Sequence, residues 1–561
     1  MLSKKVIAIA TGFLIAISLS LALIGSYKPP KNDIPFVILI SREPDMIHPL
    51  FSKVGTSLLL FKAMFRGLVE RDDQLKLRPI LVDNIPTAEN GLVRQLSDGK
   101  MEVTWRFKKG LKWSDGHPLT PSDLIFAHEV MTHPDVVSLA LEKSDAKNIH
   151  SIKLMDDGYT IKVLWKRPYY NYHTAHFVLP RHSLESALKN DPGNFEKLFR
   201  PSPGNPNSHP YQRNPVVNGP YTLDQWKIGT YIVLKANPHY HKMAKTPKFA
   251  FKIVKDVNSL LINLIYGAGD ACTTISPEQH IFLKNKYSDI LNVHIIKGMG
   301  WMHMDMNLSK PQLQDSNVRK ALLYGINRKL IAKTVSYSTY KLAHSWLPPK
   351  HYAYSPRLPK YPYDPKKAAS LLRKAGWIPG KNHILMKNGR EFRLTLITDS
   401  KNPIMPQLAG FIREDFRKLG IHIDVRTMPA TVWWTRLTRR NYDLALYTWY
   451  MWPRVDGESY WASHNIPTEK NKHAGINFPG LKNSELDSIH KKLIGTIRTK
   501  DRLNLFQRHQ EIWLQELPSL PLFVLSSLSV SRKTVLNWKP TGSAIPETWN
   551  CEDWEVISSD P

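Results

Sequence analysis

The sequence predicts a mixed α/β protein with more than one lobe, and three observations lead to this fold class. The chain has 561 residues, several times the ~150 residues of a common domain. Apolar residues make up 42% of it, which excludes a disordered chain and allows a sizeable core. Residues 390–450 alternate strand and helix patterns, and this alternation favours a parallel sheet covered by helices on both faces.

The segment 390–450 shows this alternation most clearly. Asn388-Gly389 suits a hairpin turn, and apolar side chains then alternate from Phe392 to Leu396 as in a strand. Pro406–Leu419 has the apolar period of a helix, which Gly420 ends in the C′ position. Three further elements complete the series: a strand at 421–425, a short helix at 431–440 and an apolar strand at 444–449.

Other elements follow from similar local patterns. Short apolar or alternating runs predict strands at 35–40, 101–107, 161–165, 231–234, 249–254 and 301–307. Thr120-Pro121-Ser122-Asp123 combines a hydroxyl cap, a first-turn proline and a carboxylate, as helix starts do. A single helix is expected after Asp315, with a buried stripe of Val318, Ala321, Leu322, Ile326 and Leu330. Six prolines between 201 and 220 predict a loop and a domain boundary.

The N-terminus predicts export. Lys4 and Lys5 precede an apolar run from Val6 to Gly25, which is typical of an export signal. The run is also long enough to span a bilayer, so residues 1–30 are either a cleaved signal peptide or an uncleaved membrane anchor. We expect a periplasmic or otherwise extracytoplasmic protein, tethered in the second case. Since this is the one long apolar run, a polytopic membrane protein is excluded.

Charge and cysteine content exclude other classes. Lys and Arg total 77 and Asp and Glu total 48, for a net charge of +29. The basic residues are spread along the chain without a run of five or six, so we expect no nucleic-acid partner. Two cysteines, Cys272 and Cys551, exclude a disulfide scaffold and a Cys-rich zinc protein. Whether these two thiols pair or stay free is open at this stage.

Motifs of catalysis and cofactor binding are missing from the sequence. There is no Gly-x-Ser-x-Gly elbow, no Walker-type loop and no helix with zinc-spaced histidines. The run Met302-His303-Met304-Asp305-Met306 places its three methionines on one face of a strand. Such a face is more often core than a soft-metal site. We therefore expect no enzyme activity, no cofactor and no metal.

A set of ordered motifs between residues 35 and 550 carries a resemblance. The strongest runs from Leu111 to Leu124 and contains Lys112-Trp113-Ser114-Asp115-Gly116. The others are Phe65–Val69, Asn218–Tyr221 with Trp226 and Asn237-Pro238, Gly267–Asp270, Val318–Leu322, Tyr363–Pro365 with Ala375-Gly376, and Leu517-Pro518 with Pro521-Leu522. Together they resemble extracellular solute-binding protein family 5, the periplasmic oligopeptide- and dipeptide-binding proteins of peptide ABC transporters.

The resemblance implies a type II periplasmic-binding-protein-like fold: two lobes joined by a hinge, with an extra domain inserted in the first lobe. Lobe 1 is then discontinuous (31–70, 215–297 and 525–561), the inserted subdomain spans 71–214, and lobe 2 spans 298–524. Such a chain is the monomeric substrate-binding subunit of an ABC importer. It captures di- or oligopeptides and delivers them to a permease and ATPase complex in the inner membrane. Two alternatives stay open: a metal-, metallophore- or haem-binding member, and an envelope chaperone or receptor on the same scaffold.

Candidate ligand residues lie at the end of the strand 444–449, because ligands of open α/β sheets bind beyond the carboxyl ends of the strands. They are Thr448, Trp449, Tyr450 and Trp452. In the relatives this segment offers backbone groups to an extended peptide. There an Asp three residues after the Trp holds the peptide ammonium, but that position here is Trp452. The nearest replacements are Asp456, which we choose as the anchor, and Glu458.

Two further candidates complete the predicted site. Trp433 and Trp434 could form a wall of the cleft, since aromatic side chains bury much area with few rotors. Of two adjacent helical residues one usually lies in the core, so we expect at most one wall residue and take Trp433. Gly55 and Thr56 lie where relatives place a loop that contacts the peptide backbone, and glycine permits close approach. An ordinary loop before a helix is the alternative there.

Overall fold

A computed structural model gives the fold. It describes residues 36–48, 50–52, 54–136, 145–174, 177–202, 205, 207–452, 455–543 and 545–557. The predicted signal or anchor at 1–30 lies outside these residues. Within them, no helix combines the length and the apolar character that crossing a membrane requires.

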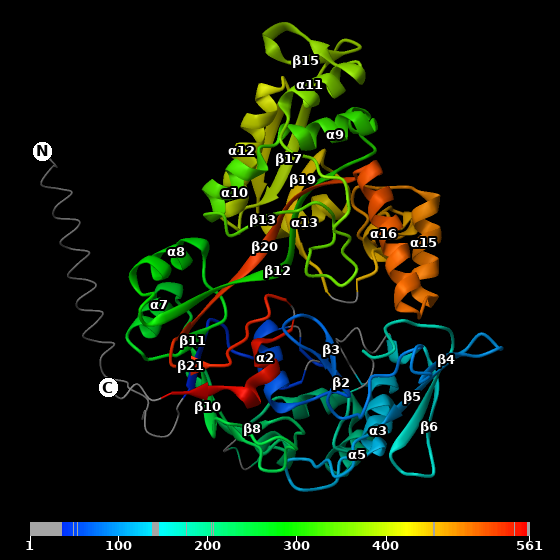
Figure 1. Ribbon diagram of the computed structural model, residues 1–561, viewed down its shortest axis with the longest axis vertical. Coiled ribbons are helices and arrows are strands. Elements are labelled where there is room, and N and C mark those ends of the chain that lie inside the picture. Colours follow the sequence, from blue (N-terminus) through cyan, green and yellow to red (C-terminus); the bar gives the residue numbers. More distant parts are fainter. Residues whose placement is uncertain are drawn as a thin grey trace, which may run out of the picture.

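One mixed sheet runs through both lobes of the molecule (Figure 1). Its strand order is β18-β17-β19-β12-β20-β11-β1-β10-β9-β8, with β13 paired to β20 outside this path. The long strands β12 (Leu291–Met306) and β20 (Ser519–Arg532) are antiparallel partners over most of their length. They connect the part of the sheet that contains β17–β19, here called the upper lobe, to the part that contains β1 and β8–β11, here called the lower lobe.

The upper lobe confirms the strand and helix series predicted for 390–450. Strand β17 (Arg393–Asp399) pairs in parallel with β18 (His422–Met428) and with β19 (Leu444–Tyr450). Helices α12 (Ile404–Lys418) and α13 (Ala430–Thr438) connect them. The second neighbour of β19 is β12, which is antiparallel, so the sheet is mixed rather than all parallel. The other helices here are α9 (Ser316–Gly325), α10 (Arg328–Ser336), α11 (Pro365–Lys374), α14 (Glu458–Trp461), α15 (Ser484–Gly495) and α16 (Thr499–Glu516).

The lower lobe is assembled from distant parts of the chain. Strand β1 (Phe36–Ile40) pairs in parallel with β10 (Lys248–Ile253) and β11 (Ala271–Cys272). In its core the ring of Phe36 lies 5.1 Å from that of Trp554 and 6.4 Å from that of Phe249. The remaining elements are α2 (Gly55–Met64), β8 (Tyr221–Lys227), β9 (Tyr231–Ala236), α7 (Val257–Ile265), α8 (Pro277–Lys286), β21 (Val535–Leu536), η5 (Glu547–Asp553) and β22 (Glu555–Val556).

Strands between residues 93 and 165 form a separate antiparallel sheet. It contains β4 (Val93–Gln95), β5 (Met101–Arg106), β7 (Thr160–Trp165) and β6 (Ile149–Leu154), in that order. Its own hydrophobic cluster includes the buried Trp105, Trp113 and Trp165. Helix α3 (Pro121–Thr132) begins with the predicted capping box of Thr120 and Asp123.

The smaller elements of the molecule are β2 (Val69–Arg71), β3 (Leu77–Pro79), α5 (Arg181–Asn190), η1 (Pro192–Phe199), α6 (Pro210–Arg213), η2 (Pro311–Leu313), β13 (Lys341–Leu342), β14 (Ile378–Pro379), η3 (Lys381–His383), β15 (Leu385–Lys387), β16 (Arg390–Glu391) and η4 (Ser463–Asn465).

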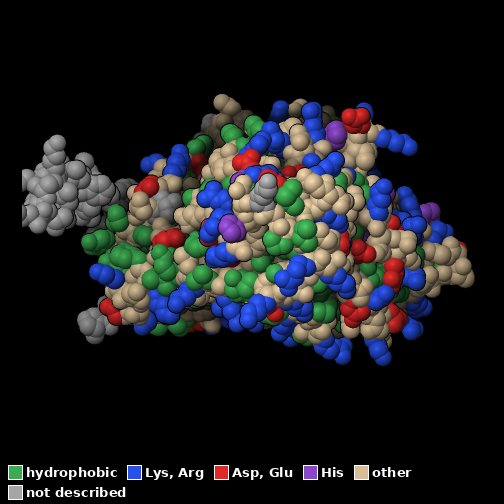
Figure 2. Space-filling model, turned by 90° about the horizontal axis from the view of Figure 1, so that it is seen from above, with side chains coloured by type: hydrophobic (Ala, Val, Ile, Leu, Met, Phe, Trp, Pro, Cys, Tyr) green, Lys and Arg blue, Asp and Glu red, His purple; other side chains and the backbone are tan. Residues whose placement is uncertain are grey.

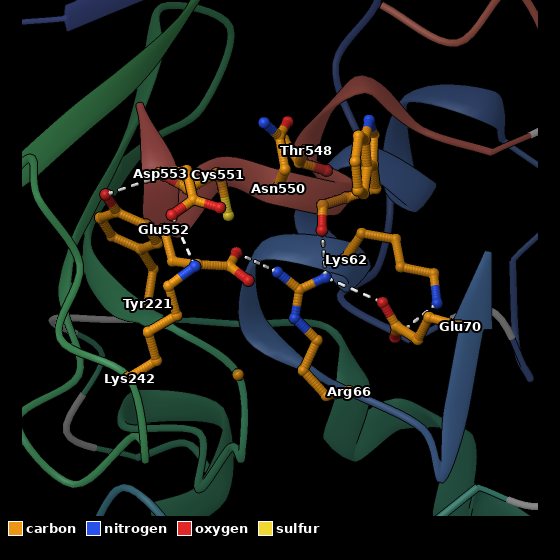
Figure 3. Close-up of polar contacts among 12 residues, drawn as sticks. Lys62, Arg66, Glu70, Tyr221, Lys242, Thr548, Asn550, Cys551, Glu552 and Asp553 are labelled. Atoms are coloured by element: carbon orange, nitrogen blue, oxygen red, sulfur yellow. Dashed lines mark hydrogen bonds and ion pairs between the residues drawn. The ribbon is translucent and has the colours of Figure 1, made fainter. Parts of the chain in front are cut away.

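Buried ion pairs fasten the N-terminal segment of the lower lobe to its C-terminal segment (Figure 3). The Arg66 guanidinium donates to Glu70 at 2.9 Å, to the Trp549 carbonyl at 2.9 Å and to Glu552 at 2.5 Å. Lys62 adds a 2.7 Å bond to Glu70. Burial opposes the charge of Arg66, yet the Glu552 and Glu70 carboxylates raise the pKa of this guanidinium well above its usual value. The motif Phe65–Val69 thus stabilises the scaffold.

Three sequence predictions need correction or completion. The helix expected after Asp315 is two helices, α9 and α10, separated at Ile326-Asn327, so Leu330 lies outside the buried stripe and is 50% exposed. The proline-rich stretch 201–220 contains the short helix α6. Cys272 and Cys551 are both buried free thiols. The three methionines at 302, 304 and 306 do lie in the core of the upper lobe.

Positive charge is not gathered in one place on the face shown in Figure 2. Lys and Arg side chains are scattered over this face, with Asp and Glu side chains among them. Among the described residues, some surface charges form exposed ion pairs, such as Arg426 with Asp424 at 2.8 Å. A scattered distribution of this kind differs from the basic stripe that tracks a nucleic-acid backbone.

Candidate ligand-binding site

The end of β19 presents an open strand edge. On one side β12 pairs with the whole strand, from Gly300 opposite Tyr450 to Met306 opposite Leu444. On the other side β17 pairs with Leu444–Leu446 only. Among the residues that the structure describes, strand pairing on that side therefore stops before Tyr447. An extended segment added there could bond the backbone of 447–450, as in strand augmentation.

Aromatic side chains surround this edge. The Trp449 ring lies 6.4 Å from Trp434, 5.6 Å from Tyr460 and 6.3 Å from Phe478. Tyr450 and Trp452 are 66% and 45% exposed, whereas Met451 between them is buried. The Thr448 hydroxyl is buried without a hydrogen-bond partner among the described residues. This surface joins unpaired backbone to large apolar area, which suits ligands with a peptide backbone and varied side chains.

The two adjacent tryptophans of α13 take opposite positions. Trp433 is buried and packs on Tyr447, with ring centroids 5.3 Å apart. Trp434 is 44% exposed and lies edge-on to Trp449. Only one of the pair lies in the core, as expected, but the exposed member is Trp434 rather than the chosen Trp433. Sequence alone does not show this because the helix phase fixes only the relative positions of the two side chains.

Asp456 is half-buried in the turn before α14. Its carboxylate accepts a bond from the Glu458 amide at 3.0 Å and one from the Tyr170 hydroxyl at 3.4 Å. Burial raises the pKa of Asp456, against the opposing effect of these bonds and of the nearby Arg502. Gly457 makes the turn possible, since it has φ +89° and a Cβ there would lie 2.9 Å from the Trp346 ring. Glu458 is less buried, and its carboxylate lies 3.5 Å from His464.

A junction between the lobes, which the sequence analysis missed, lies beside Asp456. The Arg502 guanidinium of α16 lies 3.2 Å from the centre of the Tyr170 ring. Tyr170 follows β7 of the separate antiparallel sheet. Arg502 also donates to the Tyr352 hydroxyl at 3.0 Å and to the Leu493 carbonyl at 2.5 Å. We call Tyr170, Tyr352, Asp456 and Arg502 the junction cluster. Of these four, only Asp456 was named from the sequence. The other three come from distant segments and carry no local pattern, so no spacing rule could have found them.

One nitrogen of this buried arginine lacks a partner. Arg502 is 4% exposed, and its Nη2 is buried with no hydrogen bond to any described residue. Its other partners are neutral oxygens and an aromatic ring. A buried guanidinium without a carboxylate partner is costly, and it can bind an acidic group that enters the junction.

The predicted loop contact lies on the lower lobe. Gly55 is the first residue of α2, and a Cβ at this position would meet nothing within 4 Å. The Thr56 hydroxyl is buried and has no partner among the described residues. No described contact joins Gly55 or Thr56 to Thr448–Trp452. The structure thus brings together the candidates of the upper lobe, and it places these two on the other lobe.

The fold and site define a class of protein: a two-lobed binding protein of the type II periplasmic fold, with an open strand edge and a polar junction between its lobes. The model of the bacterial extracellular solute-binding proteins, family 5, matches residues 77–471. The chain belongs to this family.

Two curated relatives match over most of the chain. The oligopeptide-binding protein AppA of Bacillus subtilis is 24% identical over 467 residues, 80% of this chain and 78% of AppA. The glutathione-binding protein GsiB of Escherichia coli K12 is 23% identical over 534 residues, 93% of this chain and 94% of GsiB.

Solved structures share the fold. An oligopeptide-binding protein of Thermus thermophilus, complexed with a pentapeptide, has a TM-score of 0.65 and 24% identity. The match covers 93% of this chain and 96% of that one. HbpA2 of Haemophilus parasuis has a TM-score of 0.75 and 18% identity, over 93% of this chain and 100% of its own. These likenesses establish a two-lobed type II fold.

Proposed function

We propose that this chain is the substrate-binding subunit of an ABC importer, and that it captures peptides between its lobes for delivery to a membrane permease and its ATPase. The observation that carries the proposal is the unpaired edge of β19 at 447–450. Backbone bonding of this kind accepts varied sequences, because it does not depend on ligand side chains. The names of AppA and GsiB, an oligopeptide- and a glutathione-binding protein, support the same class of ligand.

The hinge of this clamp is proposed at the register shift of β12. Pairing with β20 shifts between Lys297 and Gly300, opposite Leu525 and Ser526. A Cβ at Gly298 would lie 2.1 Å from the Leu525 carbonyl oxygen, so only glycine permits this approach of the strands. The shift supports lobe boundaries near 297/298 and 524/525. The separate sheet β4-β5-β7-β6, with its own hydrophobic cluster, supports 71–214 as the inserted subdomain. Ligand binding would then favour the closed form that the permease recognises.

Asp456 is the proposed anchor of the peptide ammonium. Its half-buried carboxylate lies in the junction cluster, where closure of the lobes would exclude water and strengthen polar contacts. The Tyr170 hydroxyl, now 3.4 Å away, would share the carboxylate with the ammonium. We further propose that the protein acts as a monomer outside the cytoplasm, with residues 1–30 as its signal or anchor, and that it performs no bond chemistry.

Native mass spectrometry of the purified protein tests the proposal. We expect co-purified peptides, and tight binding after unfolding, refolding and addition of random pentapeptide or nonapeptide pools. X-ray scattering should show a smaller radius of gyration when the pool is added. Retention of nickel, a nickel–histidine complex or haem in place of peptides would instead support the metallophore and haem alternatives. A constant radius despite tight binding would contradict the clamp.

A further inference from the structure

A group of three potential metal ligands lies within the proposed inserted subdomain, residues 71–214, outside the junction cluster. Asp115, His117 and His182 each offer one ligand atom, and these atoms all lie within 4.8 Å of one another. The Asp115 Oδ2 atom lies 2.7 Å from His182 Nε2 and 3.3 Å from His117 Nδ1. Two imidazole nitrogens therefore converge on one carboxylate oxygen.

The backbone on both sides of this group is fixed. Asp115 and His117 flank Gly116, which has φ +88° in a turn closed by the Gly116 amide on the Trp113 carbonyl at 3.0 Å. His182 is the second residue of α5, whose first amide, that of Arg181, donates to Asp123 at 3.1 Å. The ligand atoms thus come from two segments that are far apart in sequence and whose backbones are held in place. Ion binding therefore costs little conformational entropy.

The imidazole rings are also held in place. The His117 ring stacks on the His182 ring at 4.2 Å with an interplanar angle of 15°, and the His182 ring lies 6.5 Å from the buried Trp113. The side chains remain 28–59% exposed, so an ion can reach them from solvent. His239 lies beside the same turn, because a Cβ on Gly116 would be 3.6 Å from its Nε2. It does not belong to the group whose ligand atoms all lie within 4.8 Å of one another, so water would complete the coordination of an ion.

We propose that Asp115, His117 and His182 form a surface site for a first-row transition cation such as Zn²⁺, Ni²⁺ or Cu²⁺. Two imidazoles and one carboxylate match the ligand preference of these ions, whereas Mg²⁺ and Ca²⁺ prefer oxygen ligands. Ligands at ~2.1 Å from a tetrahedral ion lie ~3.4 Å apart. The observed separations of 2.7 and 3.3 Å reach this spacing with a small opening of the group.

A hydrogen bond already draws two of the three ligand groups together. At present the carboxylate holds His182 by a hydrogen bond. A divalent ion would take the place of the shared proton, and it would link the turn at 115–117 to α5.

Isothermal titration calorimetry on tag-free, EDTA-treated full chain tests the proposal, with ZnCl₂ and NiCl₂ as the probes. We expect one site in the parent and at least tenfold weaker binding in His117→Asn and in His182→Asn. His133→Asn is the matched control, because this exposed imidazole lies 4.0 Å from Asp135 and belongs to no three-ligand group among the described residues. It should bind as the parent does. Equal affinity in all four proteins, or no binding in the parent, would overturn the site.

Two further measurements locate the ion. The Cu²⁺ electron paramagnetic resonance spectrum should show two imidazole nitrogens in the parent and one in His182→Asn, and retention of two would overturn the assignment. Addition of the pentapeptide pool should leave Zn²⁺ affinity unchanged, since the site is separate from the proposed peptide cleft. Competition between peptide and Zn²⁺ would place the ion in the cleft instead.

Discussion

Two buried arginines, one in each lobe, have opposite electrostatic surroundings. Arg66 of the lower lobe lies between two carboxylates, Glu70 and Glu552, which it bonds at 2.9 and 2.5 Å. Arg502 of the upper lobe bonds a tyrosine hydroxyl and a carbonyl and stacks on Tyr170. No carboxylate among the described residues lies within ion-pair distance of it. The first guanidinium is neutralised by the scaffold itself, whereas the second lacks a direct counter-charge.

We propose that this difference separates a structural site from a ligand-binding one. A buried charge that is paired with its counter-charges holds two chain segments together and requires no ligand for neutralisation. A buried charge without a direct counter-charge, at a junction between lobes, lowers the stability of the empty protein unless a ligand completes it. Since Asp456 with its raised pKa lies beside Arg502, the junction cluster offers both signs of charge to a zwitterionic guest.

The largest expected effect comes from Arg66. Replacement by methionine removes the cationic partner of Glu552 and leaves Glu70 with Lys62 alone, and should lower the free energy of unfolding by about 3–5 kcal/mol. Urea denaturation measures it. The control Arg426→Met breaks an exposed pair with Asp424 and should change stability by less than about 0.5 kcal/mol. Equal losses in the two variants would show that the Arg66 cluster is not structural.

Gly298 tests the link between the two lobes. An alanine Cβ would meet the Leu525 carbonyl oxygen at 2.1 Å, and backbone cannot easily move away, so Gly298→Ala should destabilise by about 1–3 kcal/mol. In Gly410→Ala, the control within α12, the added Cβ meets nothing within 4 Å and should stabilise by about 0.5–1 kcal/mol. Thermal unfolding in both variants measures the contrast. If Gly298→Ala left the thermal stability unchanged, the argument for a close approach of the strands at the proposed hinge would be wrong.

Substitution of Asp456 tests the proposed ligand-binding role of the junction cluster. Asp456→Ala should weaken binding of the pentapeptide pool at least tenfold, about 1.4 kcal/mol, because the peptide ammonium loses its counter-charge. An ammonium binds the ionised carboxyl, so parent affinity should fall as the pH is lowered through the raised pKa of Asp456. This fall begins at a higher pH than for an exposed aspartate, and the variant should lack it. Calorimetry at several pH values measures both effects.

Glu458→Ala separates the two candidate anchors. Its carboxylate is less buried and pairs with His464, so we expect less than a threefold loss of affinity. Unchanged binding in Asp456→Ala, together with a large loss in Glu458→Ala, would move the anchor to Glu458.

The sequence predicted local structure well where side chains within a few residues decide it. The capping box at Thr120, the C′ glycine at 420 and the hairpin at Asn388-Gly389 all formed as expected. The prediction that Leu330 lies on a buried helix stripe was wrong, because the helix breaks at Ile326-Asn327 and the second helix has a different phase. The junction cluster was out of reach, since Tyr170 and Arg502 meet only through the arrangement of two lobes. Asp456 was predicted by analogy, whereas its partner Tyr170 required the fold.

The smallest effect concerns the contact across the lobes. Tyr170→Phe removes a long hydrogen bond to Asp456 but keeps the ring over Arg502, so affinity for the pentapeptide pool should fall only about twofold. Tyr170→Ala also removes the cation–π contact and should cost more, about 1–2 kcal/mol. Calorimetry compares the two variants. Equal losses would show that the ring over Arg502 does not contribute to closure.

Hydrogen–deuterium exchange at residues 447–450 tests the central claim most directly, because it reports on the open edge of β19 itself. When the pentapeptide pool is added, we predict slower exchange of amides in this segment, since an extended peptide bonds its free side. Amides of the lower-lobe strands β8 and β9 should keep their rates and serve as the internal reference. Tight peptide binding with unchanged exchange at 447–450 would contradict the account.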